Sequence, residues 1–289
     1  MSEVFSRRDY AKMKPGILYL VATPIGNLED ITLRALRILG QVEFVACEDT
    51  RQTRILLQHY DIQARLITYY GAREKEGSRE LMRQLNTGRS IALVSDAGMP
   101  GISDPGSLIV RDAIVANITV IPIPGPSAGV VALAASGLAA DRFIFEGFLP
   151  KKQLEKRKRL AALSQERRTI IFYESPRRLM DTLRDMLMIM GERRAVVARE
   201  LTKVHEEFVR GSLGGLIERM EEGSVRGEVV IIVEGSGEEI DWERVDIPAY
   251  VIRVQERMGL DRMSALKLVA HLSGLAKSTL YKSSLKAKG

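Results

Sequence analysis

The first 125 residues alternate short apolar runs with amphipathic helical patterns. Alternation at this spacing is typical of parallel strands joined by crossover helices. The predicted strands span residues 17–22, 42–47, 64–70, 90–95 and 118–124, and a helical pattern follows each of the first four. The sequence therefore predicts an open α/β sheet, and such sheets bind ligands outside the carboxyl ends of their strands.

A second series of apolar runs follows a segment of small residues that predicts a closely packed helix. Further strands are predicted at residues 142–148, 168–175, 194–202 and 227–235, with helical segments between them. A glycine- and acid-rich stretch then precedes a wholly helical pattern. We therefore predict a polar N-terminal extension, two α/β domains, and a linker with a C-terminal helical module, with the boundaries 1–15, 16–125, 126–237 and 238–289.

Composition and charge narrow the class of protein. The chain has 289 residues, of which 45% are apolar, which is typical of a soluble globular protein with room for two cores. Its 43 basic residues exceed its 37 acidic ones, and the net charge of +6 favours a polyanionic partner. No stretch resembles a signal peptide or a membrane span, so we expect a cytoplasmic protein without a membrane partner.

Cysteine and histidine are too few for a metal or disulfide framework. The single cysteine, Cys47, excludes an intrachain disulfide, and the three histidines are scattered along the chain. We therefore expect no metal site.

Three irregular loops follow predicted strands of the first domain. The most irregular, 93–106, reads LVSDAGMPGISDPG, and the others are 22–32 and 123–129. Parallel strands bring such loops to one edge, where they can line one cleft, although each could also be a tight turn without a ligand. No P-loop or G-x-G-x-x-G pattern is present, so the predicted ligand lacks a pyrophosphate.

Acidic residues at these strand ends are candidates for ligand contact. Asp96 is the favoured one, whereas Asp30 and Asp104 suit helix starts. After the second strand, polar residues of 47–54 suggest the mouth of a substrate site. The alternative is that Asp49 caps a helix and pairs with Arg51.

Two stretches of the second domain also place charged residues directly after predicted strands, and two further segments are rich in basic residues. FYESPRR, 172–178, and ARELTK, 198–203, supply carboxylates and cations that could meet phosphates. KKQLEKRKR, 151–159, is either an anion-binding surface or a solvated helix face. The C-terminal helices, 263–285, have the form of a helix-turn-helix or of a small packing module.

Several motifs, taken in their order and spacing, resemble the ribosomal RNA small subunit methyltransferase I family. The motifs that carry this resemblance are VATPIGNLEDIT, EDTRQT, SDAGMPGISDPG, PGPSA, FYESPRRL and ARELTK. The resemblance implies the tetrapyrrole methylase fold, with S-adenosylmethionine between two α/β domains. It also implies methylation of the ribose 2′-hydroxyl of a cytidine in small-subunit rRNA, within an assembled 30S subunit, by a homodimer.

The resemblance also implies a cofactor site. S-adenosylmethionine has no phosphate, so backbone groups of irregular loops can hold it. The residues expected at the cofactor are Pro24, Asp96, Ala97, Gly98, Met99, Ile102, Ser103 and Ser127. The chain departs from the family at 69–77, YYGAREKEG, where only the glutamate of an expected His-Asn-Glu stretch is present.

Methyl transfer to a ribose hydroxyl needs alignment and removal of a proton. The candidate bases and orienting groups are Glu48, Asp49, Arg51, Glu74, Glu200 and Lys203. We hypothesise that Glu48 or Glu74 contributes most. The alternatives are a methylase acting on a corrin or porphyrin, and a nucleic-acid-binding protein that uses its C-terminal helices and has no activity.

Overall fold

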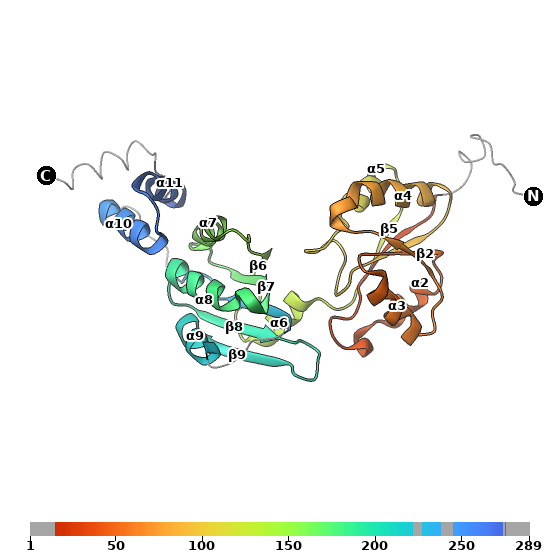
Figure 1. The fold of residues 1–289 in the computed structure, drawn as a ribbon, viewed down its shortest axis with the longest axis horizontal. Helices are drawn as coiled ribbons and strands as arrows, with labels where there is room; N and C mark the ends of the chain where they lie inside the picture. The colour runs from red at the N-terminus through yellow and green to blue at the C-terminus, as the bar shows by residue number, and fades with distance from the viewer. Residues whose placement is uncertain (1–14, 222–226, 238–244, 274, 276–289) are drawn as a thin grey trace, which may run out of the picture. The chain divides into compact units, whose positions relative to one another are not determined.

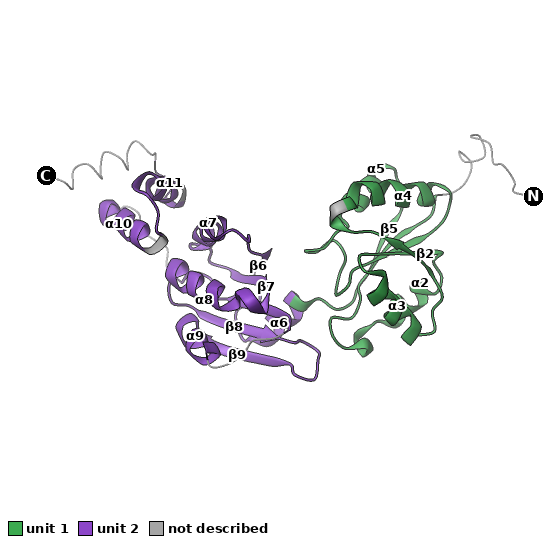
Figure 2. Ribbon diagram, viewed as in Figure 1, with its two compact units in different colours: residues 1–128 green, residues 129–289 purple. Residues whose placement is uncertain are grey.

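The computed structural model describes residues 15–221, 227–237, 245–273 and 275, and the chain forms two compact units. Unit 1 is Met1–Ala128 and unit 2 is Gly129–Gly289 (Figure 2). The finer division into four parts stays a prediction. The predicted N-terminal extension, nearly all of the last predicted helix and part of the linker lie outside the described residues.

Unit 1 contains a five-stranded parallel sheet with the strand order β3-β2-β4-β1-β5 (Figure 1). Its strands are β1 (Leu18–Val21), β2 (Phe44–Cys47), β3 (Arg65–Thr68), β4 (Ile91–Val94) and β5 (Val120–Ile123). Its helices are η1 (Leu28–Asp30), α2 (Leu33–Leu39), α3 (Thr50–His59), η2 (Gly71–Arg73), α4 (Glu74–Asn86) and α5 (Ser107–Val115). The predicted parallel strands and crossover helices are thus present.

Helices cover both faces of this sheet. Successive side chains of a strand point to opposite faces, so a buried strand needs apolar residues throughout. In β4, Ala92 and Val94 pack with residues of α2 and α3, whereas Ile91 and Leu93 pack with residues of α4 and α5. The all-apolar sequence of β4 therefore follows from its central place in the sheet.

Unit 2 contains a mixed five-stranded sheet with the order β6-β7-β10-β8-β9. Its strands are β6 (Phe143–Phe148), β7 (Thr169–Glu174), β8 (Arg194–Arg199), β9 (Glu207–Ser212) and β10 (Val229–Val233). Its helices are α6 (Ala128–Ser136), α7 (Gln153–Leu163), α8 (Pro176–Met190), α9 (Leu213–Glu221), α10 (Ile247–Met258) and α11 (Arg262–Ser273). Strand β9 is absent from the sequence prediction because polar residues interrupt its apolar pattern.

The main core of unit 2 lies between this sheet and three helices. Buried side chains of α7, α8 and α9 pack against β7, β8 and β10. On α6, Gly129 packs closely on β7, because an added Cβ would lie 3.3 Å from Cγ2 of Ile171. Helices α10 and α11 form a smaller cluster of their own around Val251, Leu266 and Val269.

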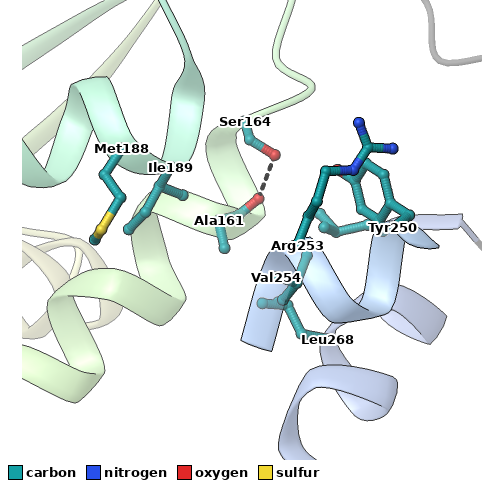
Figure 3. Close-up of a pocket in the computed structure, with 9 residues that line it drawn as sticks. Ala161, Ser164, Met188, Ile189, Tyr250, Arg253, Val254 and Leu268 are labelled. Carbon is teal, nitrogen blue, oxygen red and sulfur yellow. Dashed lines mark hydrogen bonds between the residues drawn. The ribbon is translucent and has the colours of Figure 1, made fainter. Parts of the chain in front are cut away.

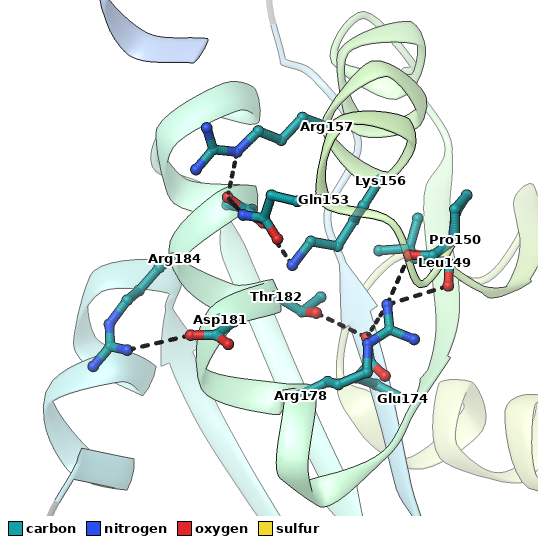
Figure 4. A network of polar contacts seen from close by, with 11 residues as sticks. Leu149, Pro150, Gln153, Lys156, Arg157, Glu174, Arg178, Asp181, Thr182 and Arg184 are labelled. Carbon is teal, nitrogen blue, oxygen red and sulfur yellow. Dashed lines mark hydrogen bonds and ion pairs between the residues drawn. The ribbon is translucent and has the colours of Figure 1, made fainter. Parts of the chain in front are cut away.

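A buried ion pair joins helix α7 to helix α8 (Figure 4). The Lys156 ammonium lies 2.6 Å from Asp185, and the two side chains are only 3% and 4% exposed. Arg157 and Gln153 also donate hydrogen bonds to the Asp185 carboxylate. Burial of a charge is costly unless the charge is paired and hydrogen-bonded, and this network supplies both.

We expect Asp185→Asn to lower the free energy of unfolding by about 3 kcal/mol, because it leaves the Lys156 charge buried without a counter-ion. Urea unfolding followed by circular dichroism measures the change. The matched control is Asp181→Asn on the same helix, whose carboxylate is 72% exposed and 3.7 Å from Arg184. That change should cost less than about 0.5 kcal/mol, and equal losses for the two variants would contradict the prediction.

Candidate cofactor and active site

Three loops meet at the carboxyl edge of the sheet in unit 1. Thr23, after β1, exchanges two backbone hydrogen bonds with Gly98, after β4, at 2.9 and 3.0 Å. An added Cβ on Gly98 would lie 3.6 Å from the Pro126 carbonyl oxygen, after β5. An added Cβ on Gly125 would lie 2.8 Å from the Cβ of Ala22. Because β4 lies between β2 and β1, its loop lies at the centre of this edge.

The loop after β4 has a backbone that few residue types adopt. Its φ angles are positive at Gly98, Gly101, Ser103 and Gly106, and that of Gly106 is 144°. An added Cβ on Gly106 would lie 3.1 Å from the Gly101 nitrogen and 3.0 Å from Leu93. Ser103, at φ 58°, adopts the left-handed region that disfavours side chains, and such positions concentrate at functional sites.

Hydrogen bonds from side chains that follow β1 and β4 stabilise the conformation of this loop. The Thr23 hydroxyl donates to the Ser95 carbonyl at 2.9 Å. The Ser95 hydroxyl contacts the Asp104 carboxylate and accepts from the Ala97 N–H. Asp104 is therefore a loop anchor and does not start a helix; Gly106 is the N-cap of α5 instead. In the same way Thr32, and not Asp30, caps α2.

Parts of this loop remain available to a ligand. The backbone N–H groups of Met99 and Ser103 have no hydrogen-bond partner among the described residues. The side chain of Ile102 is 52% exposed. Residues 95–106 include no lysine or arginine, so the loop offers backbone donors and apolar surface without a phosphate-binding charge. These features fit a phosphate-free ligand such as S-adenosylmethionine.

Three carboxylates lie around the same edge. An Asp96 carboxylate oxygen accepts the Asp49 backbone N–H at 3.1 Å and so joins the end of β4 to the end of β2. Partial desolvation raises the pKa of Glu48, although the residue is largely exposed, and the carboxylates of Asp104 and Asp96 raise it further. Burial also raises the pKa of Asp104. A positively charged ligand, such as a sulfonium, would relieve this mutual repulsion.

The carboxylate of Asp49 is already hydrogen-bonded to Arg51. It accepts from the Arg51 backbone N–H at 2.8 Å as the N-cap of α3, and it binds the Arg51 guanidinium at 2.6 Å. These hydrogen bonds lower the pKa of Asp49 to about 2, which makes it a weak base. The capping and ion-pair interpretation of Asp49 and Arg51 is thus what the structure shows.

The structure separates Glu48 from Glu74. Glu48 is exposed and has no hydrogen bond or ion pair with the described residues. Glu74 accepts hydrogen bonds from the Tyr69 hydroxyl and from the Gly106 N–H. Of the two, only Glu48 therefore has a carboxylate without a partner.

Glu200 and Lys203 lie in unit 2, at the end of β8. They form an ion pair of 2.9 Å, which lowers the pKa of Glu200. Glu174 and Arg199 both lie opposite Val229 of β10, so the FYESPRR and ARELTK motifs share one edge of the second sheet.

The two arginines of FYESPRR have different surroundings, and Figure 4 shows those of Arg178. Arg178 pairs with buried Glu174 at 3.6 Å and donates to the carbonyls of Leu149 and Pro150. Arg177 is exposed and has no partner among the described residues. Arg178 therefore serves the fold, whereas Arg177 is available to an anion.

The sequence-predicted residues are distributed over both units. All eight predicted cofactor residues lie in the three loops of unit 1, with Pro24 and Ser127 half-buried in the outer two. Sequence reasoning missed the anchors Thr23, Ser95 and Tyr69. Buried polar residues directly after apolar strands were the available signal for Thr23 and Ser95.

A separate pocket in unit 2 lies between the α7–α8 pair and the C-terminal helices (Figure 3). Its lining is mostly apolar, and its one cation, Arg253, stacks over Tyr250. It offers no carboxylate or free nucleophile for catalysis. Within the described part of the chain, no group of three or more metal-binding side chains is found. No described helix is long and apolar enough to cross a membrane.

Comparisons with known proteins agree with this architecture. The family model of tetrapyrrole (corrin/porphyrin) methylases matches residues 17–217. The structure is similar to uroporphyrin-III C-methyltransferase from Thermus thermophilus in complex with S-adenyl homocysteine, with a TM-score of 0.55 and 19% identity over 76% of this chain and 97% of that one. It is also similar to a diphthine synthase, with a TM-score of 0.59 and 15% identity over 76% of this chain and 90% of that one. These likenesses show the fold.

Curated relatives are much more similar in sequence. A ribosomal RNA small subunit methyltransferase I from Halalkalibacterium halodurans is 47% identical over 92% of this chain and 93% of its own. One from Synechocystis sp. is 46% identical over 93% of this chain and 98% of its own. Because the similarity extends over nearly the full length of both partners, the chain belongs to the ribosomal RNA small subunit methyltransferase I family of tetrapyrrole methylases.

Proposed function

We propose that this protein methylates the ribose 2′-hydroxyl of a cytidine in small-subunit rRNA, with S-adenosylmethionine as methyl donor. The observation that carries the proposal is the 46–47% identity to ribosomal RNA small subunit methyltransferases I over more than nine tenths of the chain. We further propose that it acts as a homodimer in the cytoplasm on an assembled 30S subunit. The net charge of +6 supports an RNA partner.

The loop after β4 is the proposed binding site of the cofactor. The free N–H groups of Met99 and Ser103 would donate to its polar ends, and Ile102 would contact its apolar surface. Glu48, Asp96 and Asp104 would balance its positive charge. When bound, S-adenosylmethionine supplies an electrophilic methyl group on a positively charged sulfur.

Glu48 is the proposed general base. Its carboxylate is unpaired and exposed, so a ribose hydroxyl can reach it. Its raised pKa makes it a stronger proton acceptor than Asp49 or Glu200, whose pKa values are lowered. Glu48 would take the hydroxyl proton as the new C–O bond forms and the S–CH3 bond breaks.

A corrin or porphyrin methylase is the second candidate. The fold shared with uroporphyrin-III C-methyltransferase favours it. The identity to that structure is 19%, whereas that to the rRNA methyltransferases is 46–47%.

The decisive test uses radiolabelled S-adenosylmethionine with small subunits, and separately with naked rRNA, from cells that lack the enzyme. Nuclease digestion then maps the label. Label at one cytidine ribose in the subunit supports the proposal. Cofactor binding without label in either RNA would overturn it and favour the small-molecule methylase.

We expect Glu48→Gln to lower kcat by about 100-fold or more and to remove the acidic limb of its pH profile. The base is active when deprotonated, so in the profile of kcat/KM for the cofactor, which reports the free enzyme, the raised pKa of Glu48 places that limb above the usual value of about 4.3 for glutamate. Single-turnover methylation at limiting and at saturating cofactor between pH 4.5 and 8.5 measures both effects.

The control is Glu43→Gln at the other end of the same strand, where the carboxylate pairs with Arg89 at 3.4 Å. It should retain full activity. An unchanged acidic limb in Glu48→Gln would exclude Glu48 as the base.

We expect Arg177→Ala to weaken rRNA binding and to reduce the slope of log K against log salt by about one, because one phosphate contact is lost. Its thermal stability should stay unchanged, because Arg177 has no partner among the residues that the structure describes. Arg178→Ala should instead lower the stability, since it leaves Glu174 buried without its cation. Filter binding at several salt concentrations and thermal melts separate the two variants, and equal salt slopes for Arg177→Ala and wild type would contradict the assignment.

A further inference from the structure

The carboxylate of Glu74 connects three segments of unit 1. Glu74 begins α4, and its Oε1 atom accepts the Tyr69 hydroxyl at 3.1 Å and the Gly106 N–H at 3.0 Å. Tyr69 directly follows β3, and Gly106 is the last residue of the irregular loop after β4. One oxygen atom therefore ties the end of β3 to the far end of the loop after β4.

Gly106 is the point where the loop becomes a helix. It is the N-cap of α5, and its carbonyl accepts the first helical N–H, from Val110, at 3.1 Å. The N–H of an N-cap residue has no acceptor within its own helix, and for buried Gly106 the Glu74 carboxylate supplies that acceptor. A negative charge near the start of α5 is also favoured by the helix dipole. The conformation of the loop end thus depends on Glu74.

Tyr69 keeps the Glu74 carboxylate in place. The tyrosine side chain is 1% exposed, and its ring lies against α4, where a Cβ added to Gly77 would come within 2.8 Å of it. Burial, and then the Glu74 charge, raise the pKa of Tyr69, so its hydroxyl stays protonated and donates. The carboxylate therefore has a fixed position from which to hold Gly106.

We propose that Glu74 is a positioning residue, which fixes the loop 95–106 through Gly106 so that the N–H groups of Met99 and Ser103 are aligned for the cofactor. The inference rests on the proposed function in one respect, namely that the cofactor is S-adenosylmethionine. It assigns Glu74 a positioning role, because its Oε1 accepts both the Tyr69 hydroxyl and the Gly106 N–H, and the variants below test that role against proton transfer.

Glutamine and alanine distinguish these roles. Glu74→Gln keeps an amide oxygen that can accept the Gly106 N–H, but it cannot take a proton. Glu74→Ala removes the acceptor. Tyr69→Phe removes only the hydroxyl and tests the link if the alanine variant does not fold. Glu76→Ala is the matched control, since Glu76 lies in the same first turn of α4, is 72% exposed, and forms an ion pair of 4.0 Å with exposed Arg73.

The experiment measures S-adenosylmethionine affinity of the full chain by titration calorimetry, together with kcat, KM for the cofactor and the melting temperature. We expect Glu74→Ala to weaken cofactor binding about tenfold or more and Tyr69→Phe two- to threefold, from the loss of hydrogen bonds to a charged group. Glu74→Gln should bind within about threefold of wild type and keep its kcat and pH profile. Glu76→Ala should match wild type in every measurement.

Two outcomes would overturn the inference. A Glu74→Gln variant that binds the cofactor normally but loses kcat by orders of magnitude would make Glu74 a proton-transfer group. A Glu74→Ala variant with a lower melting temperature but normal cofactor affinity would make its role purely structural. If wild type binds the cofactor but methylates no rRNA, the proposed function fails while the calorimetric test of Glu74 stands.

Discussion

Two backbone hydrogen bonds between Thr23 and Gly98 hold together the loops on which the candidate site depends. Gly98 adopts a positive φ, and Ser103 and Gly106 also do so farther along the same loop. Such a backbone persists only where its surroundings hold it. Thr23, Ser95 and Glu74 hold it, while the N–H groups of Met99 and Ser103 have no partner among the described residues.

The order of the strands explains why the loop after β4 forms hydrogen bonds with the segments on both sides of it. The chain places β4 between β2 and β1, so the loop after β4 lies between the loops that follow those two strands. Asp96 reaches the end of β2, and Gly98 meets the loop after β1. In an open parallel sheet, this edge is the position where ligands bind. The irregular sequence of the loop and its central place in the sheet therefore both point to this loop as the candidate ligand site.

Charged residues fall into two groups in this protein. Lys156, Asp185 and Glu174 are buried and fully paired, and they stabilise the second unit. Glu48 and Arg177 are exposed and unpaired among the described residues, and they are therefore available to a substrate. Neighbouring residues in one motif can belong to different groups, as Arg177 and Arg178 do.

The sequence by itself determined the class of fold, the position of the irregular loops and the family, because apolar periodicity and contiguous motifs are local properties. It did not reveal β9, whose polar residues hide a strand that pairs with β8. Nor could it rank the candidate carboxylates. The partner of Asp96 is 47 residues away and that of Glu74 is 32 residues away, at Gly106. Only the tertiary structure decided which carboxylates were occupied and which was free, because hydrogen-bond partners are chosen by distance in space and not along the chain.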